Sequence, residues 1–328
     1  MSSAKNKVLK AVCVLLLAVF LVTGILLLLE MWDKRQSIFP TFNSGETDAL
    51  TYNGEKYILK ENIETFLVLG LDKTKGDTVI SDAYNNDKQA DFLMLFVFDN
   101  ENKKCSAINI NRDSMAEVNV LGVAGNKVDT VTKQIALAHT YGNGKDVSCR
   151  NTADSVSKLL LDTKVNHYIS LTLDSVAVLN DAVGGVEVEV LDDFNGIDSE
   201  LIKGEKVTLK GEQALKYIRT RYGLEDNTNS TRMVRQEQFI KALHKKLGEC
   251  IEADEEFIVN TSLELSELIV SDRSVTQLQE LTKKFNEYEF NGILSFEGES
   301  KLGKEFMEFY PDKDSVEKIV IDLFYKKK

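Results

Sequence analysis

The chain has 328 residues and a formal net charge of −12, with 43% hydrophobic and 28% charged residues. A chain of this length can bury a sizeable core as one large domain or two modest ones. The excess of acidic residues repels nucleic acid, so we expect no nucleic-acid partner and expect any anion-binding site to be local.

A hydrophobic segment near the N-terminus predicts a membrane anchor. Residues 11–29 carry no charge, and a helix of this length spans roughly 28 Å, close to the thickness of a bilayer's hydrocarbon core. Lys5, Lys7 and Lys10 precede it, which predicts that residues 1–10 are cytoplasmic and the remainder is extracellular. A cleaved signal peptide is the alternative, although the segment is longer than a typical signal core.

Residues 30–60 form a predicted linker that contains one short hairpin, and a series of predicted strands follows it. In the linker, the Asn53-Gly54 pair predicts a hairpin turn. Further along, short apolar or alternating runs bounded by polar residues predict strands, and one of them is apolar enough to be a buried central strand. The predicted strands are residues 65–72, 91–99, 106–111, 168–173 and 185–190.

Helical periodicity occupies the stretches between these strands. The predicted helices are residues 130–142, 152–162, 174–185 and 233–247, and three more helical segments follow in the C-terminal tail. Strands that alternate with helices predict an α/β domain with a central, largely buried sheet.

Arginines cluster in one part of the chain. Half of the eight arginines lie within seventeen residues, at positions 219, 221, 232 and 235. Arg219 and Arg221 would share a face in an extended segment, whereas Arg232 and Arg235 lie one turn apart at a predicted helix start, next to the neutral donor Gln236. Guanidinium forks bind phosphate oxygens bidentately, so the cluster predicts a phosphate site. The alternative is that each arginine pairs with a surface carboxylate.

Two carboxylates lie at predicted strand ends. Asp72 closes the first strand after the linker and Asp91 opens the next, so an antiparallel pairing would place them together. Carboxylate oxygens beside a phosphate are what Mg²⁺ prefers, although each residue could also be a simple turn residue. Arg112 follows the third strand. The sequence contains no G-x-S-x-G motif, and no Cys–His pairing is evident from it.

Seven motifs in order resemble the LytR–CpsA–Psr family. They are "FLVLGLD", "ADFLMLFVFD", "INRDSM", "KQIALAHTYGNG", "LNDAVGGVEVEV", "LKGEQALKYIRTR" and "TRMVRQEQFIKAL", and they cover residues 63–250. The resemblance implies a three-layer α–β–α sandwich with a mixed central sheet, formed by an extracellular catalytic domain over residues 61–328.

The resemblance also implies an activity. Members of the family transfer a glycan linked to polyprenyl pyrophosphate onto peptidoglycan in Gram-positive bacteria, as in teichoic acid or capsule attachment, and hold the lipid in an apolar channel. By resemblance, Asp72 and Asp91 bind Mg²⁺ or Mn²⁺ and form the catalytic centre with Arg112. The implied pyrophosphate-binding residues are Arg219, Arg221, Arg232, Arg235, Gln236 and Lys133.

The chain departs from the family pattern at three places. Gln89-Ala90 replaces an Arg-Ser pair, Asn111 replaces the proline before Arg112, and residues 73–88 form a longer connection than usual. Two alternative functions follow. The protein could hydrolyse the same lipid with water as acceptor, or it could be a non-catalytic polyprenyl-phosphate-binding regulator of the envelope. The glycopolymer and the general base, Asp72 or Asp91, stay open.

Overall fold

A computed structural model of the chain describes residues 49–71, 86, 88–221, 223–224, 229–254, 256–304 and 306–328. The chain divides into two compact units, Met1–Asp48 and Ala49–Lys328. The predicted cytoplasmic tail and membrane anchor lie outside the described residues. In the described part, no helix is long and apolar enough to cross a membrane.

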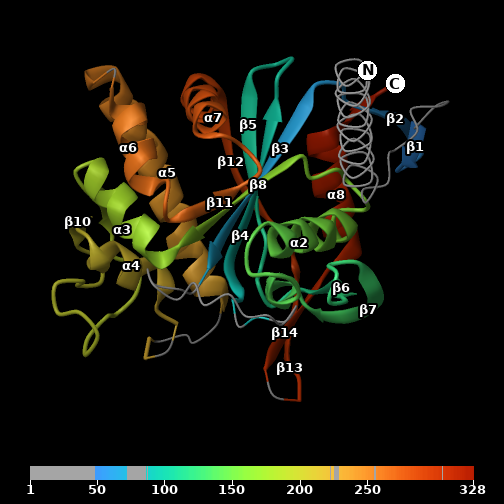
Figure 1. The fold of residues 1–328 in the computed structure, drawn as a ribbon, viewed down its shortest axis with the longest axis horizontal. Helices are drawn as coiled ribbons and strands as arrows, with labels where there is room; N and C mark the ends of the chain where they lie inside the picture. The colour runs from blue at the N-terminus through green and yellow to red at the C-terminus, as the bar shows by residue number, and fades with distance from the viewer. Residues whose placement is uncertain are drawn as a thin grey trace, which may run out of the picture. The chain divides into compact units, whose positions relative to one another are not determined.

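A six-stranded mixed sheet forms the centre of the second unit (Figure 1). Its strands, in spatial order, are β11 (Ile269–Ser271), β8 (His167–Thr172), β3 (Ile63–Leu71), β4 (Ala90–Asp99), β5 (Lys104–Asn109) and β12 (Glu289–Ser295). The pairs β3–β8 and β5–β12 are parallel, and the other neighbours are antiparallel. The sheet is therefore mixed, as the resemblance implies.

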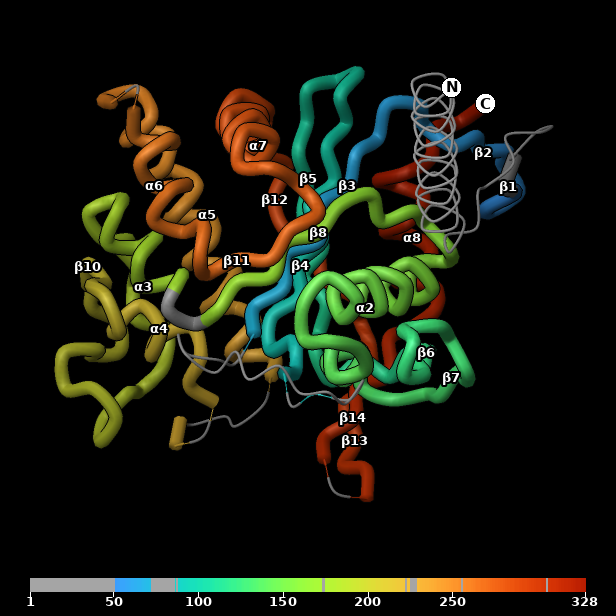
Figure 2. Tube along the Cα trace, in the orientation of Figure 1, coloured from blue at the N-terminus to red at the C-terminus, as the bar shows by residue number. Residues whose placement is uncertain are grey.

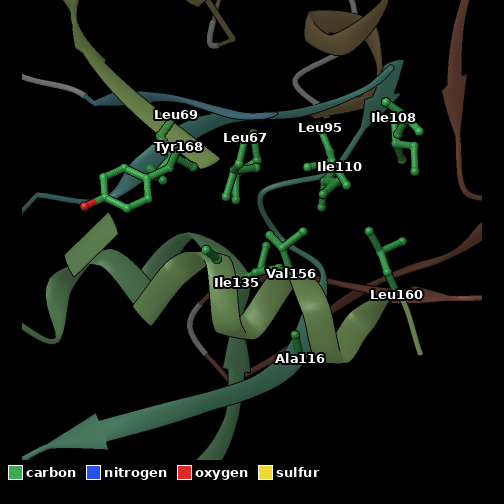
Figure 3. Close-up of a cluster of buried hydrophobic side chains, with 14 of the residues drawn as sticks. Leu67, Leu69, Leu95, Ile108, Ile110, Ala116, Ile135, Val156, Leu160 and Tyr168 are labelled. Atoms are coloured by element: carbon green, nitrogen blue, oxygen red, sulfur yellow. The ribbon is translucent and has the colours of Figure 1, made fainter. Parts of the chain in front are cut away.

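Helices pack on both faces of this sheet. On one face, α2 (Asp146–Leu159) and α8 (Lys313–Phe324) cover the leucines of β3 and β4, and Figure 3 shows Leu67 and Leu95 facing Val156. On the other face, α7 (Val275–Glu287) covers Phe66 and Phe98. Because both faces are buried, β3 and β4 read as nearly continuous apolar runs in the sequence.

A group of helices and a short ribbon lie beside the sheet (Figure 2), and they bury a second apolar cluster. It joins α3 (Leu173–Ala182), α4 (Glu212–Arg219), α5 (Asn229–Ala253) and the two-stranded ribbon β9 (Val186–Glu189) and β10 (Lys206–Leu209). This group of helices packs next to the ends of β3 and β8, and the space between them forms the pocket described below.

The remaining elements border the sheet. The predicted Asn53-Gly54 hairpin is confirmed, and it pairs with the last strand of the chain. These elements are β1 (Ala49–Tyr52), β2 (Glu55–Leu59), β15 (Tyr325–Lys327), β6 (Met115–Leu121), β7 (Lys127–Gln134), the 3₁₀ helix η1 (Ile135–Thr140), α6 (Phe257–Leu265), β13 (Gly298–Leu302) and β14 (Met307–Pro311).

Two local predictions are wrong. Residues 130–134 belong to strand β7 instead of a helix, because Val131 pairs with Val118 of β6 and the helical part is only the short η1. Arg219 is the last residue of α4, so Arg219 and Arg221 do not share the face of an extended segment. The predicted helix at 152–162 begins earlier, at Asp146.

Candidate functional site

A pocket opens between the sheet and helices α3, α4 and α5. Its volume is about 130 Å³, far more than the roughly 10–15 Å³ that one water needs. Apolar side chains dominate its wall, and the polar ones are Asp91, Thr172, Ser175, Arg219, Arg232 and Gln236. The apolar members include Val68, Phe92, Leu179, Ile218, Phe239 and Leu243. An apolar wall with a few polar groups suits an amphipathic ligand.

Gly70 allows the close approach of strands at the pocket. It pairs with Phe92 across β3 and β4, and a Cβ at position 70 would lie 2.9 Å from the Phe92 Cβ. A larger residue there would push the Phe92 ring, which itself lines the pocket. The glycine of the "FLVLGLD" motif thus has a packing reason.

Asp91 and Arg112 form an ion pair at the pocket. Asp91 is the second residue of β4, Arg112 follows β5, and the antiparallel pairing of these strands brings the two side chains together. Arg112 donates through Nη1 to Asp91 Oδ1 and through Nη2 to Gln89 Oε1. Gln89, at the position where the family usually has arginine, therefore accepts a hydrogen bond from Arg112 and helps to fix its orientation.

Asp113 lies directly behind this pair. Its Oδ1 accepts a hydrogen bond from Gln134 at 3.0 Å and lies 3.5 Å from Arg112 Nε, and its Oδ2 lies 3.8 Å from Arg221 Nη1. Burial raises the pKa of the Asp113 carboxyl, while Arg112, Arg221 and Arg232 oppose that rise. One aspartate in a turn carries no pattern of its own, so the sequence does not mark Asp113 as a site residue.

Arg232 is the most buried cation that lines the pocket. It is 4% exposed, and its Nη2 donates to the Asp91 backbone carbonyl at 3.3 Å. Burial lowers its pKa to about 10, and the neighbouring Arg112 and Arg221 contribute in the same direction. At neutral pH the guanidinium is still charged, so the pocket holds a desolvated cation suited to a phosphate.

The four arginines of the cluster do not all meet at one point. Arg219 and Arg232 line the pocket, and Arg221 approaches Asp113. Arg235 is 1% exposed and lies behind α4, where it donates to the backbone carbonyls of Tyr217 and Thr220. It holds the end of the helix that carries Arg219.

Arg235 is also held from its other sides. Its Nε lies 2.8 Å from Asp192 Oδ2, outside hydrogen-bonding geometry, and its guanidinium carbon lies 5.3 Å and 5.8 Å from the ring centres of Phe194 and Tyr217. The predicted direct contact of Arg235 with pyrophosphate is not supported by this geometry, since protein groups surround the guanidinium.

The other predicted site residues fall in three places. Gln236 lines the pocket and donates to the Ile218 carbonyl at 3.2 Å. Lys133 lies on β7, where its ammonium donates to the Tyr141 hydroxyl at 2.9 Å. Asp72 lies outside the described residues; Leu71, which precedes it, pairs with Ala90, which precedes Asp91.

The carboxylate chemistry at the pocket fits a hydrated divalent cation. Asp91 supplies one carboxylate among the residues that line it. Within the described ranges, no group of three or more His, Cys, Asp or Glu is arranged to hold a metal ion. Mg²⁺ keeps several waters and shares one or two carboxylates with substrate phosphates, so Asp91 and one further carboxylate would be a sufficient protein donor set.

A Cys–His contact that the sequence did not reveal lies away from the pocket. Cys149 Sγ is 3.7 Å from His139 Nε2, and both residues are fully buried. Burial raises the pKa of the Cys149 thiol to about 12 and lowers the pKa of His139 to about 4. The thiol therefore stays protonated and the pair is a packing contact, not a nucleophile with its base.

The chain matches one known protein family over most of its length. The sequence profile of the LytR_cpsA_psr family matches residues 39–319. The chain belongs to the LytR_cpsA_psr family. This confirms the resemblance drawn from the seven motifs.

Curated relatives include two transferases. The chain is 26% identical over 216 residues to the polyisoprenyl-teichoic acid–peptidoglycan teichoic acid transferase TagU of Enterococcus faecalis, covering 66% of this chain and 63% of that protein. A TagU of Bacillus cereus strain AH820 is 30% identical over 193 residues, covering 59% of this chain and 55% of that protein. The chain spans about three-fifths of the length of these relatives.

Solved structures share the fold. A structure described as TagT bound to LI-WTA superposes with a TM-score of 0.60 at 19% identity, covering 80% of this chain and 90% of that chain. TagV of B. subtilis superposes with a TM-score of 0.59 at 22% identity, covering 81% of this chain and 97% of that chain.

Proposed function

We propose that this protein is a membrane-anchored phosphotransferase that moves a glycopolymer from polyprenyl pyrophosphate onto peptidoglycan. The observation that carries the proposal is the pocket itself, whose mostly apolar wall also includes Asp91, Arg219 and Arg232. An amphipathic ligand with an apolar chain and a phosphate headgroup complements both parts. The names of the TagU relatives describe the same class of reaction for those proteins.

The proposed reaction is one displacement at phosphorus. A hydroxyl of peptidoglycan attacks the phosphorus next to the glycan, and the bond from that phosphorus to the lipid phosphate oxygen breaks. A phosphodiester forms, and polyprenyl monophosphate leaves. The hydroxyl proton passes to a carboxylate, for which Asp91 at the pocket is the candidate in the described part. Such chemistry depends chiefly on positioning and charge neutralisation.

The arginines supply that neutralisation. Arg232 is desolvated, so its charge acts on a phosphate with little screening by water. Arg112 orients Asp91, and Asp113 and Gln89 orient Arg112. Asp91, with Asp72, would hold Mg²⁺ or Mn²⁺, which when bound neutralises charge on the phosphate oxygens.

The proposal includes a membrane anchor and an extracellular catalytic unit. The apolar segment 11–29 and the preceding lysines support an anchor with the catalytic unit outside the cell, where peptidoglycan lies. The test uses full-length protein with a polyprenyl-pyrophosphate-linked glycan and peptidoglycan. We expect glycan bound covalently to peptidoglycan, and its loss in Asp91→Ala and Arg232→Ala. Full transfer by both variants would refute the site assignment.

A further inference from the structure

Two buried asparagines meet behind the pocket. Asn111, just before Arg112, is 5% exposed, and Asn229, the first residue of α5, is 7% exposed. Asn229 Nδ2 donates to Asn111 Oδ1 at 2.6 Å. A buried amide that bonds to a second amide, 118 residues away, ties two separate chain segments together.

Both amides also bond outward, in opposite directions. The backbone N–H of Asp113 donates to Asn111 Oδ1 at 3.0 Å, and Arg232 Nη2 donates to Asn229 Oδ1. A backbone N–H and a guanidinium can only donate, so each end fixes which atom of its amide is the oxygen. The result is one polar chain from Arg232 through both amides to the turn at Asp113.

We propose that Asn111 and Asn229 are positioning residues, an amide bridge that holds Arg232 in register with the Arg112–Asp113 turn for phosphate binding. Arg232 needs such support, because its Nε has no hydrogen-bond partner among the described residues, and Nη2 otherwise donates to the Asp91 backbone carbonyl at 3.3 Å. The bridge fixes the distance between the Arg232 guanidinium and the Asp91–Arg112 ion pair, so that both can contact one phosphate. This inference rests on the proposed function.

The bridge needs an acceptor at position 111. Asn111 stands where the family resemblance leads one to expect proline, and proline has no side-chain oxygen and could not accept from Asn229 or Asp113. In this chain the side chain therefore takes part in orienting the phosphate-binding arginine. Removing the amide should weaken the recognition of phosphate and leave the recognition of the apolar chain unchanged.

The test compares two lipids on the full-length protein in detergent. Polyprenyl pyrophosphate probes the arginines and the apolar wall, and polyprenol, which lacks phosphate, probes the wall alone. We expect Asn111→Leu to weaken pyrophosphate lipid binding about tenfold, because a displaced Arg232 loses about one charge-assisted contact with the phosphate. Polyprenol binding should be unchanged. Asn111→Asp keeps an acceptor for both donors and should stay within about threefold of wild type.

A second variant and a double variant test the coupling. Asn229→Leu should cost about the same tenfold, and Asn111→Leu with Asn229→Leu should cost little more than either alone, because both break one chain. Asn166→Leu is the matched control. Asn166 Oδ1 also accepts two hydrogen bonds, from Thr65 N and Oγ1, but at the other end of β3, so both lipids should bind as in wild type.

The outcomes separate the two proposals. If wild type does not prefer the pyrophosphate lipid over polyprenol, the proposed function fails. If wild type prefers it and Asn111→Leu prefers it equally, or if the two variants are additive, the amide bridge is wrong. If Asn111→Leu melts below the assay temperature, Asn111→Ala, which deletes the amide without adding bulk, replaces it with the same expected ratio.

Discussion

Replacing Arg235 separates a structural arginine from a substrate-binding one. Arg235→Met removes two hydrogen bonds to the carbonyls of Tyr217 and Thr220 and leaves the Asp192 carboxylate, 12% exposed, without its cation. Breaking a buried ion pair on one side costs about 3–5 kcal/mol. For a folded unit of this size that corresponds to a loss of roughly 10 °C in Tm.

The assay is a thermal melt of the full-length variants, with lipid binding measured below the Tm. Adding Asp192→Asn to Arg235→Met should recover part of the loss, because the unpaired carboxylate is gone, with a coupling of about 1 kcal/mol or more. Arg219→Lys is the matched control. It should bind polyprenyl pyrophosphate about tenfold more weakly without a lower Tm, because lysine loses the fork while Arg219 lines the pocket.

The Tm of Arg235→Met can refute the structural role of Arg235. Arg235→Met with a Tm within about 2 °C of wild type would show that the guanidinium does not hold the end of α4. If Arg235→Lys lost affinity for the pyrophosphate lipid at unchanged Tm, Arg235 would contact the substrate, as the sequence pattern predicts.

Three further predictions address the pocket, pH and topology. Val68 lines the pocket, so Val68→Phe should narrow it and weaken the binding of long polyprenyl pyrophosphates more than that of short ones. The measurement is the ratio of the Kd for the long lipid to the Kd for the short one, in the variant and in wild type. Burial raises the pKa of Asp154 to about 6 from 3.8, so the folded state binds more protons and wild-type stability falls as pH rises between these values. Asp154→Asn should therefore match wild type near pH 4 and exceed it at pH 7 by up to about 3 kcal/mol in denaturant titrations; equal stability at both would contradict the assignment. A fluorescent reporter active only in the cytoplasm, fused after Lys328, should stay dark, and a bright fusion would overturn the topology.

The sheet could be predicted from the sequence because burial on both faces leaves long apolar runs. The apolar runs around Leu67 and Leu95 predict strands β3 and β4 directly, and the Asn53-Gly54 dipeptide predicts the hairpin turn. The apolar spacing around Val131 suits a helix as well as a strand, so the sequence alone predicts a helix there. Pairing with Val118, thirteen residues earlier, decides for a strand, and pairing is a tertiary property.

The site was predictable in kind but not in arrangement. The arginine cluster signals a phosphate because of the chemistry of guanidinium, wherever the side chains point. That Arg235 faces the carbonyls of α4 depends on how α5 packs against α4, which no local pattern encodes. No local pattern marks Asp113 or Asn229 as a site residue for the same reason, since each acts through residues that are distant in the sequence.

The most direct test of the phosphotransferase is the origin of the oxygen on the product. Full-length protein is incubated with polyprenyl-pyrophosphate-linked glycan and peptidoglycan in water enriched in ¹⁸O, and the glycan phosphate is analysed by mass spectrometry. Transfer predicts a phosphodiester to peptidoglycan without ¹⁸O, because the acceptor hydroxyl supplies the new oxygen. Free glycan phosphate that carries one ¹⁸O, with or without peptidoglycan, would show that water is the acceptor and would contradict the proposal.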